Sequence, residues 1–123
     1  MTCPKLPVLV FCLLLSFANA QAPEAVEANL GVMLEAVQSS SYEQFLGSTS
    51  TEFKETYSQE SFDAVSEFYT ERLAAGYDLS YLTTLNSNGY VVYLWKMTYQ
   101  DGGDDGLVSL SISNGFVGGF LIQ

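Results

Sequence analysis

The chain offers little chemistry beyond carboxylates and tyrosines. After residue 20 it contains no histidine and no cysteine, which excludes thiol catalysis, serine–histidine pairs and the commonest zinc sites. A carboxylate beside a tyrosine could still transfer protons, and Asp63 and Asp78 lie nearest to apolar stretches, with Tyr81 and Tyr93 as candidate partners. Both aspartates have ordinary structural explanations, at a helix start and in a turn. We therefore favour a non-catalytic protein and assign no catalytic residue.

Three aspartates lie among glycines in the segment 101–106. Their order differs from an EF-hand loop, in which alternating ligands are followed by a distant glutamate. Aspartate and glycine are also the residues of an ordinary hairpin loop. We favour the hairpin loop, with weak calcium binding by Asp101, Asp104 and Asp105 as the alternative. No other metal site and no cofactor is expected.

Aromatic residues recur along the C-terminal third of the chain. Tyr93, Trp95, Phe116 and Phe120 could line a ligand pocket or an interface, and aromatic residues spaced along strands more often serve a core or interface than a specific pocket. The 14 acidic and four basic residues give a net charge of −10. Such a surface repels phosphate backbones and anionic lipids, so neither nucleic acid nor a membrane is an expected partner.

Residues 1–20 have the pattern of a cleavable signal peptide. Lys5 supplies the positive charge, an apolar run follows over 8–18, and small residues precede a cleavage site after Ala20. The remaining segment, 21–123, has enough residues for one modest core. We therefore expect a single secreted or periplasmic domain.

Helical spacing of apolar residues dominates the first half of this domain. A capping-box pattern at Ser41–Gln44 marks the start of one helix, and Ser58 is the expected N-cap of the last. The expected helices cover 23–38, about 42–47, 49–57 and 59–75. In the last of these, the expected buried stripe consists of Phe62, Val65, Phe68, Tyr69 and Leu73.

After Gly76 the period changes from helical to alternating. The expected strands cover 78–86, 90–99, 107–113 and 116–122. Asn88-Gly89 and Asn114-Gly115 are strong signals for two-residue hairpin turns. Short turns join antiparallel neighbours, so the pattern predicts an α+β fold with N-terminal helices packed on a C-terminal four-stranded antiparallel sheet.

The last hairpin predicts which sheet residues face the helices. A tight turn at Asn114-Gly115 would pair Ile112 with Val117, Leu110 with Gly119 and Val108 with Leu121. The opposite face would then hold three serines and three apolar residues, namely Ser109, Ser111, Ser113, Phe116, Phe120 and Ile122. An exposed aromatic face is expected to be covered, and a second copy of the chain is the simplest cover.

This order of elements resembles the cystatin-like α+β domains of the nuclear transport factor 2-like superfamily, especially small secreted bacterial members of unknown function. The stretches that carry the likeness are 39–46, 58–62 and 113–120. The resemblance implies a curved sheet wrapped around helices, often with a pocket between them, and often dimerisation through the outer face of the sheet. Members of the superfamily range from isomerases and dehydratases to scaffolds.

The resulting expectation is a binding or scaffold domain that forms a homodimer through the outer sheet face. The alternative is a small-molecule pocket protein, or an isomerase- or dehydratase-like enzyme that uses a carboxylate base. An inhibitor or partner-binding domain ranks third, because the sequence contains no inhibitory loop signature.

Overall fold

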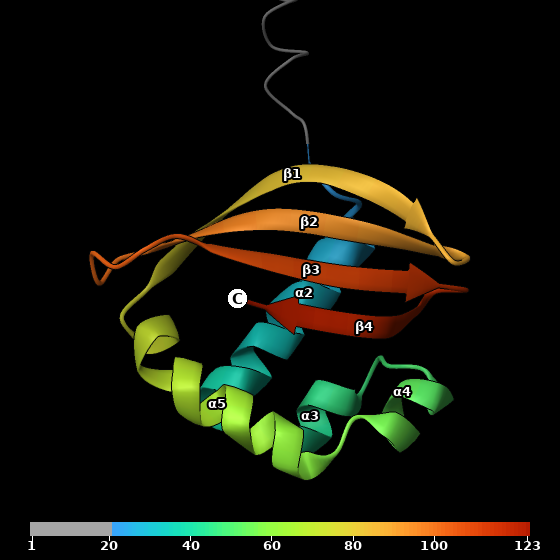
Figure 1. Cartoon of the computed structure of the whole chain (residues 1–123), viewed down its shortest axis with the longest axis horizontal. Coiled ribbons are helices and arrows are strands. Elements are labelled where there is room, and N and C mark those ends of the chain that lie inside the picture. The colour runs from blue at the N-terminus through green and yellow to red at the C-terminus, as the bar shows by residue number, and fades with distance from the viewer. Residues whose placement is uncertain (1–20) are drawn as a thin grey trace, which may run out of the picture.

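A computed structural model describes residues 21–123, so the expected signal peptide lies outside the described residues. Helices precede a sheet, which makes the fold α+β (Figure 1). The helices are α2 (Glu24–Ser39), α3 (Tyr42–Leu46), α4 (Thr51–Thr56) and α5 (Gln59–Ala74). The strands are β1 (Tyr77–Ser87), β2 (Tyr90–Tyr99), β3 (Gly106–Ser113) and β4 (Phe116–Ile122). Expected and observed boundaries agree within a few residues.

Serine side chains start three of the helices. The hydroxyls of Ser41, Ser50 and Ser58 each accept a backbone N–H three residues later. Only half of the expected capping box forms at α3. The Gln44 side chain donates to Val32 O and to Glu35 Oε1 on α2, so it joins two helices instead of closing its own.

Helix α5 packs on α2 through a buried polar contact. The Ser66 hydroxyl, which is 2% exposed, donates to the Val37 carbonyl near the end of α2 at 2.7 Å. One expectation for α5 was wrong: Phe68 is 70% exposed. At roughly 100° per residue it lies about 120° around the helix from Phe62, off the stripe that Phe62 and Leu73 bury.

The four strands form one antiparallel sheet in the order β1-β2-β3-β4, as expected. Asn88 and Gly89 have φ values of 53° and 82°, and Asn114 and Gly115 have 52° and 82°. These are the left-handed conformations that two-residue hairpin turns require. The segment after α3 covers part of the β4 edge, where Ser50 N–H donates to Val117 O and Val117 N–H donates to Ser48 O.

A bulge in β4 changes the expected register. Ile112 pairs with Val117 as predicted, but Leu110 pairs with Phe120 and Val108 pairs with Ile122. The extra residue is Gly118, where a side-chain Cβ would overlap the ring of Tyr90. Because one additional residue moves every later side chain to the other face, Phe120 and Ile122 point inward. Their expected place on the outer face was wrong.

The sheet therefore has one face toward the helices and one face away from them. In Figure 1 the sheet lies in front, α2 crosses behind it, and the remaining helices lie below the β4 side. Trp95, Met97, Val108 and Leu110 are almost fully buried on the helix side. We call the opposite side the outer face. Its central residues are Tyr90, Val92, Leu94, Leu107, Ser109, Ser111, Gly119 and Leu121.

Candidate functional site

Aromatic side chains fill the space between helices and sheet. Phe45 is fully buried and contacts several rings, including that of Phe120, whose centroid lies 5.1 Å away in an edge-on arrangement. Trp95 is 1% exposed. Two of the four aromatic candidates from the sequence, Trp95 and Phe120, are therefore core residues.

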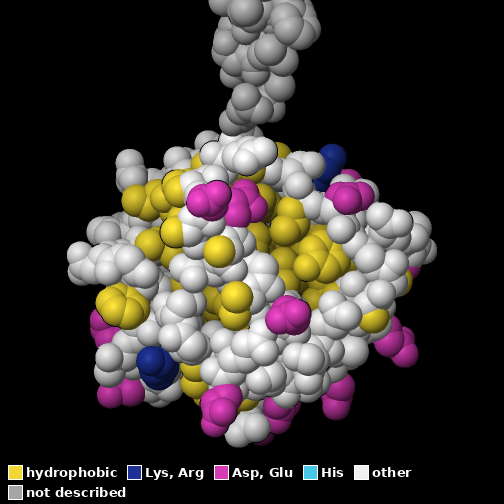
Figure 2. Space-filling model, turned by 180° about the vertical axis from the view of Figure 1, so that it is seen from behind, with side chains coloured by type: hydrophobic (Ala, Val, Ile, Leu, Met, Phe, Trp, Pro, Cys, Tyr) yellow, Lys and Arg dark blue, Asp and Glu magenta, His cyan; other side chains and the backbone are white. Residues whose placement is uncertain are grey.

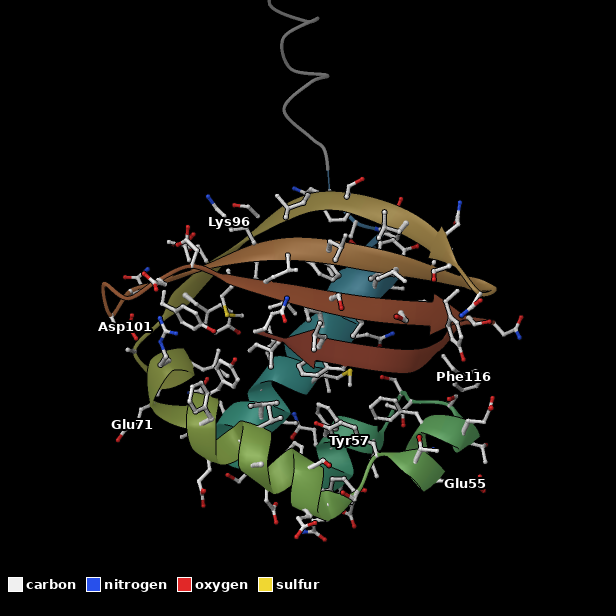
Figure 3. The ribbon with its side chains drawn as sticks, in the orientation of Figure 1. Glu55, Tyr57, Glu71, Lys96, Asp101 and Phe116 are labelled. Carbon is white, nitrogen blue, oxygen red and sulfur yellow. The ribbon has the colours of Figure 1, made fainter. Side chains whose placement is uncertain are left out.

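The other two candidates lie apart from each other. Tyr93 is half-buried on the helix side, with its ring centroid 6.3 Å from that of Trp95 and 6.5 Å from that of Tyr81. Phe116 is 54% exposed at the start of β4, and Figure 3 shows it at the hairpin end of the sheet. The structure thus brings Tyr93 and Trp95 together with Tyr81, and leaves Phe116 outside this cluster.

A glutamate from α2 completes this cluster. The Glu27 carboxylate accepts a hydrogen bond of 3.2 Å from the Trp95 indole, which joins the first turn of α2 to β2. The sequence analysis missed this contact. An acidic residue in the first helical turn is ordinarily explained by the helix dipole, and the sequence has no signal that pairs residue 27 with residue 95.

Glu27 also lines an open groove of about 590 Å³. One wall is Leu79, Ser80 and Tyr81 of β1, and the other comes from residues 21–27, including Glu24. Among residues 21–123, neither glutamate forms an ion pair with a lysine or arginine. Figure 2 shows, from behind, apolar side chains gathered below the start of the described chain, with acidic side chains beside them. The groove is suited to cationic groups.

The carboxylates proposed from the sequence do not reach this groove. Asp63 and Asp78 are both exposed, and neither lines it. Asp78 lies near the amide of Gln100, at 3.4 Å. A buried carboxylate–tyrosine pair at these positions is therefore not formed.

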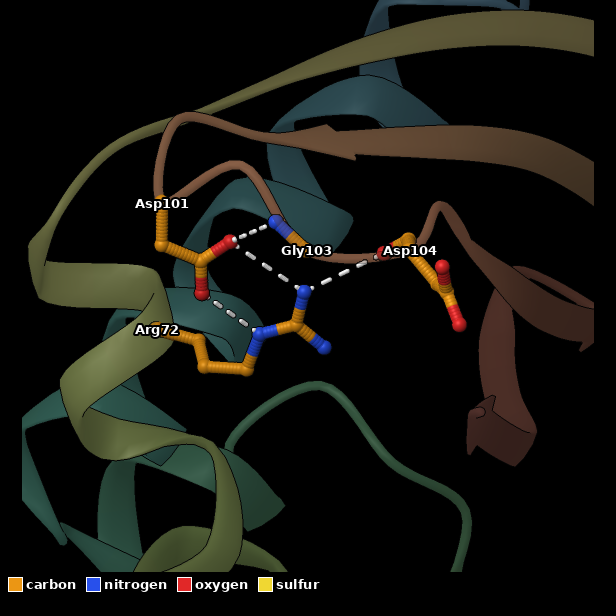
Figure 4. Close-up of polar contacts among 4 residues, drawn as sticks. All are labelled: Arg72, Asp101, Gly103 and Asp104. Carbon is orange, nitrogen blue, oxygen red and sulfur yellow. Dashed lines mark hydrogen bonds and ion pairs between the residues drawn. The ribbon is translucent and has the colours of Figure 1, made fainter.

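Arg72 of α5 forms hydrogen bonds and an ion pair with the acidic loop between β2 and β3 (Figure 4). Arg72 Nε donates to Asp101 Oδ2 at 2.7 Å, and Arg72 Nη2 donates to the Asp104 carbonyl at 3.1 Å. The hydrogen bond from Arg72, followed by that from Gly103 N–H, lowers the pKa of Asp101 below its ordinary value. Within residues 21–123 no three acidic side chains gather as a metal site would need. The three candidate ligands of the calcium alternative are thus not gathered into one site, and Asp101 is bound to Arg72.

The outer face differs from the rest of the surface in its charge. The chain has 14 acidic residues, yet the segments 79–100 and 106–123 contain none. They contain one cation, Lys96, which lies at the opposite end of the sheet from Phe116 (Figure 3). Leu85 and Leu121 are 53% and 47% exposed there. A partly apolar face is therefore present on a strongly acidic protein, and its one carboxylate within residues 21–123 is that of Asp78 near the start of β1.

Comparison with protein-family models, curated proteins and solved structures gave no match. None of the helices in residues 21–123 has the length and apolar character needed to cross a membrane.

Proposed function

We propose that this protein is a secreted, non-catalytic binding or scaffold domain that pairs with a second copy of itself through the outer face. The observation that carries the proposal is the charge of that face. Two chains of net charge −10 repel each other, and the repulsion is weakest over the central part of the outer face, where neither presents a carboxylate. Acidic residues lie instead on the helices and in the loop between β2 and β3, apart from Asp78, which lies beside Thr98 at one end of the outer face.

Exposed apolar side chains provide the driving force for this pairing. The partly exposed residues Leu85, Val92, Leu94, Leu107 and Leu121 share the outer face. Small residues between them, such as Ser109, Ser111 and Gly119, leave room for a facing sheet. A face that repeats on both partners suits an isologous twofold contact.

We further propose that the domain has the nuclear transport factor 2-like fold. It is supported by the order of the elements and by helices that pack on one face of a curved four-stranded sheet (Figure 1). Secretion is supported by the signal-peptide pattern of residues 1–20. The filled aromatic core supports binding through surfaces rather than in a deep cavity.

Native mass spectrometry and light scattering of the exported protein test the proposal. We expect a dimer without a retained small molecule. Leu121→Glu should give a folded monomer, because two added charges would face each other in the contact. Phe68→Glu is the matched control, since Phe68 is 70% exposed on α5, away from the sheet, and the dimer should persist.

A wild-type monomer at high protein concentration would overturn the proposal. If that monomer retained a stoichiometric small molecule, the alternative of a pocket protein with a carboxylate base would be favoured. Glu27 would then be the carboxylate to substitute first, because it lines the groove.

A further inference from the structure

The two edges of the sheet are protected differently. The segment 48–50 hydrogen-bonds to β4, whereas within residues 21–123 no strand pairs with the open side of β1. Native proteins usually guard a long open edge with lysine, proline, a short strand or a bulge. β1 has 11 residues without lysine or proline, and Asp78 is its one charged residue. The one protective feature of this kind in β1 is the shift in register between Tyr81 and Thr83.

The acidic groove runs beside this open edge. Leu79, Ser80 and Tyr81 belong to β1 and also form one groove wall. Glu24 and Glu27 on the opposite wall carry two full negative charges, which exceed the partial positive charge of about one half at the start of α2. An unpaired strand edge and an uncompensated negative wall therefore occur at the same place.

We propose that the β1 edge binds an extended, positively charged peptide segment by strand addition. The backbone of the segment pairs with β1, and its inward side chains lie about 5 Å from those of Leu79 and Tyr81. A lysine or arginine at such a position reaches Glu24 and Glu27, and the ring of Tyr81 offers a cation–π contact. An acidic segment would meet repulsion from the same carboxylates.

The test uses a synthetic seven-residue peptide of alternating lysine and valine with blocked ends. Titration into ¹⁵N-labelled protein should shift the amide signals of β1 saturably and slow their hydrogen exchange. Trp95, the one tryptophan of the chain, donates a hydrogen bond to Glu27 of the groove wall, so its fluorescence reports changes at Glu27.

Two control peptides and two double variants separate strand addition from diffuse attraction. A peptide with glutamate in place of lysine, and a peptide with alternate N-methylated amides, should both leave the β1 signals unchanged. Glu24→Gln with Glu27→Gln should weaken binding about threefold to tenfold, as two exposed charge contacts would predict. The Glu27→Gln side chain keeps an oxygen that can accept the hydrogen bond from the Trp95 indole. Glu60→Gln with Glu67→Gln on α5 removes the same charge elsewhere and should leave binding unchanged.

Several outcomes would overturn the proposal. The β1 signals could fail to respond to the lysine peptide, or the α5 variant could lose as much affinity as the groove variant. Concentration-dependent protection of β1 amides without peptide would show that a second copy occupies the edge. Repeating the titration with Leu121→Glu separates this result from the outer-face dimer, because β1 edge binding should survive loss of that dimer.

Discussion

The hydroxyl group of a tyrosine can stabilise the fold when it is hydrogen-bonded and destabilise it when it is buried without a partner, and two tyrosines of this chain show the two cases. The Tyr42 hydroxyl donates to the Tyr57 carbonyl, whereas the buried Tyr99 hydroxyl has no hydrogen-bond partner within the described residues. We expect Tyr42→Phe to lower the free energy of unfolding by about 1 kcal/mol, and Tyr99→Phe to leave it unchanged or raise it. Urea denaturation of both variants measures this. Equal losses would contradict it.

Asp101 is a second single residue with a predicted effect, because it makes the stability of the fold depend on pH. Its lowered pKa means that the Arg72–Asp101 contact stabilises the fold above the ordinary aspartate pKa of about 3.9. This contribution is lost as the pH falls through the lower pKa of the folded state. Between neutral pH and pH about 3, the wild type should therefore lose more stability than Asp101→Asn.

Asp105→Asn is the matched control for this pH dependence, because among residues 21–123 Asp105 forms no ion pair. This variant should follow the wild-type curve in urea denaturation across the same pH range. If the free energy of unfolding of all three proteins changed in parallel with pH, the Arg72–Asp101 contact would add no pH-dependent stability.

At the scale of the element, two glycines have opposite roles. A Cβ at Gly118 would overlap the Tyr90 ring, whereas a Cβ at Gly31, in the middle of α2, would meet no atom within 4 Å. Gly118→Ala should cost about 1–3 kcal/mol through overpacking. Gly31→Ala should gain about 0.5–1 kcal/mol, because alanine suits a helix better.

Thermal unfolding measures both glycine variants, and Tyr90→Ala combined with Gly118→Ala tests the cause. The double variant should recover part of the Gly118→Ala loss, since the smaller side chain removes the overlap. Additive losses would mean that Gly118 is needed for the bulge conformation itself.

For the whole molecule, the net charge of −10 makes the two proposed interactions respond oppositely to salt. Screening should strengthen the outer-face dimer, because it weakens repulsion between like-charged chains. The same screening should weaken binding of the lysine peptide at β1. Sedimentation and the peptide titration, each repeated from low to high salt, measure the two trends. A dimer that weakens with salt would be held by ion pairs instead.

The sequence by itself determined the α+β class, the capped starts of α3 and α5 and both tight hairpins. These features are local: a serine hydroxyl caps the N–H three residues ahead, and an Asn-Gly pair tolerates positive φ.

Only the tertiary structure decided the faces of β4 and the composition of the groove. The face of Phe120 depends on one extra residue at Gly118, where the ring of Tyr90 from a different strand leaves no room for a Cβ. The contact of Glu27 with Trp95 joins residues 68 positions apart. Such contacts arise from packing between distant elements, and local propensity and spacing carry no information about which distant side chains meet.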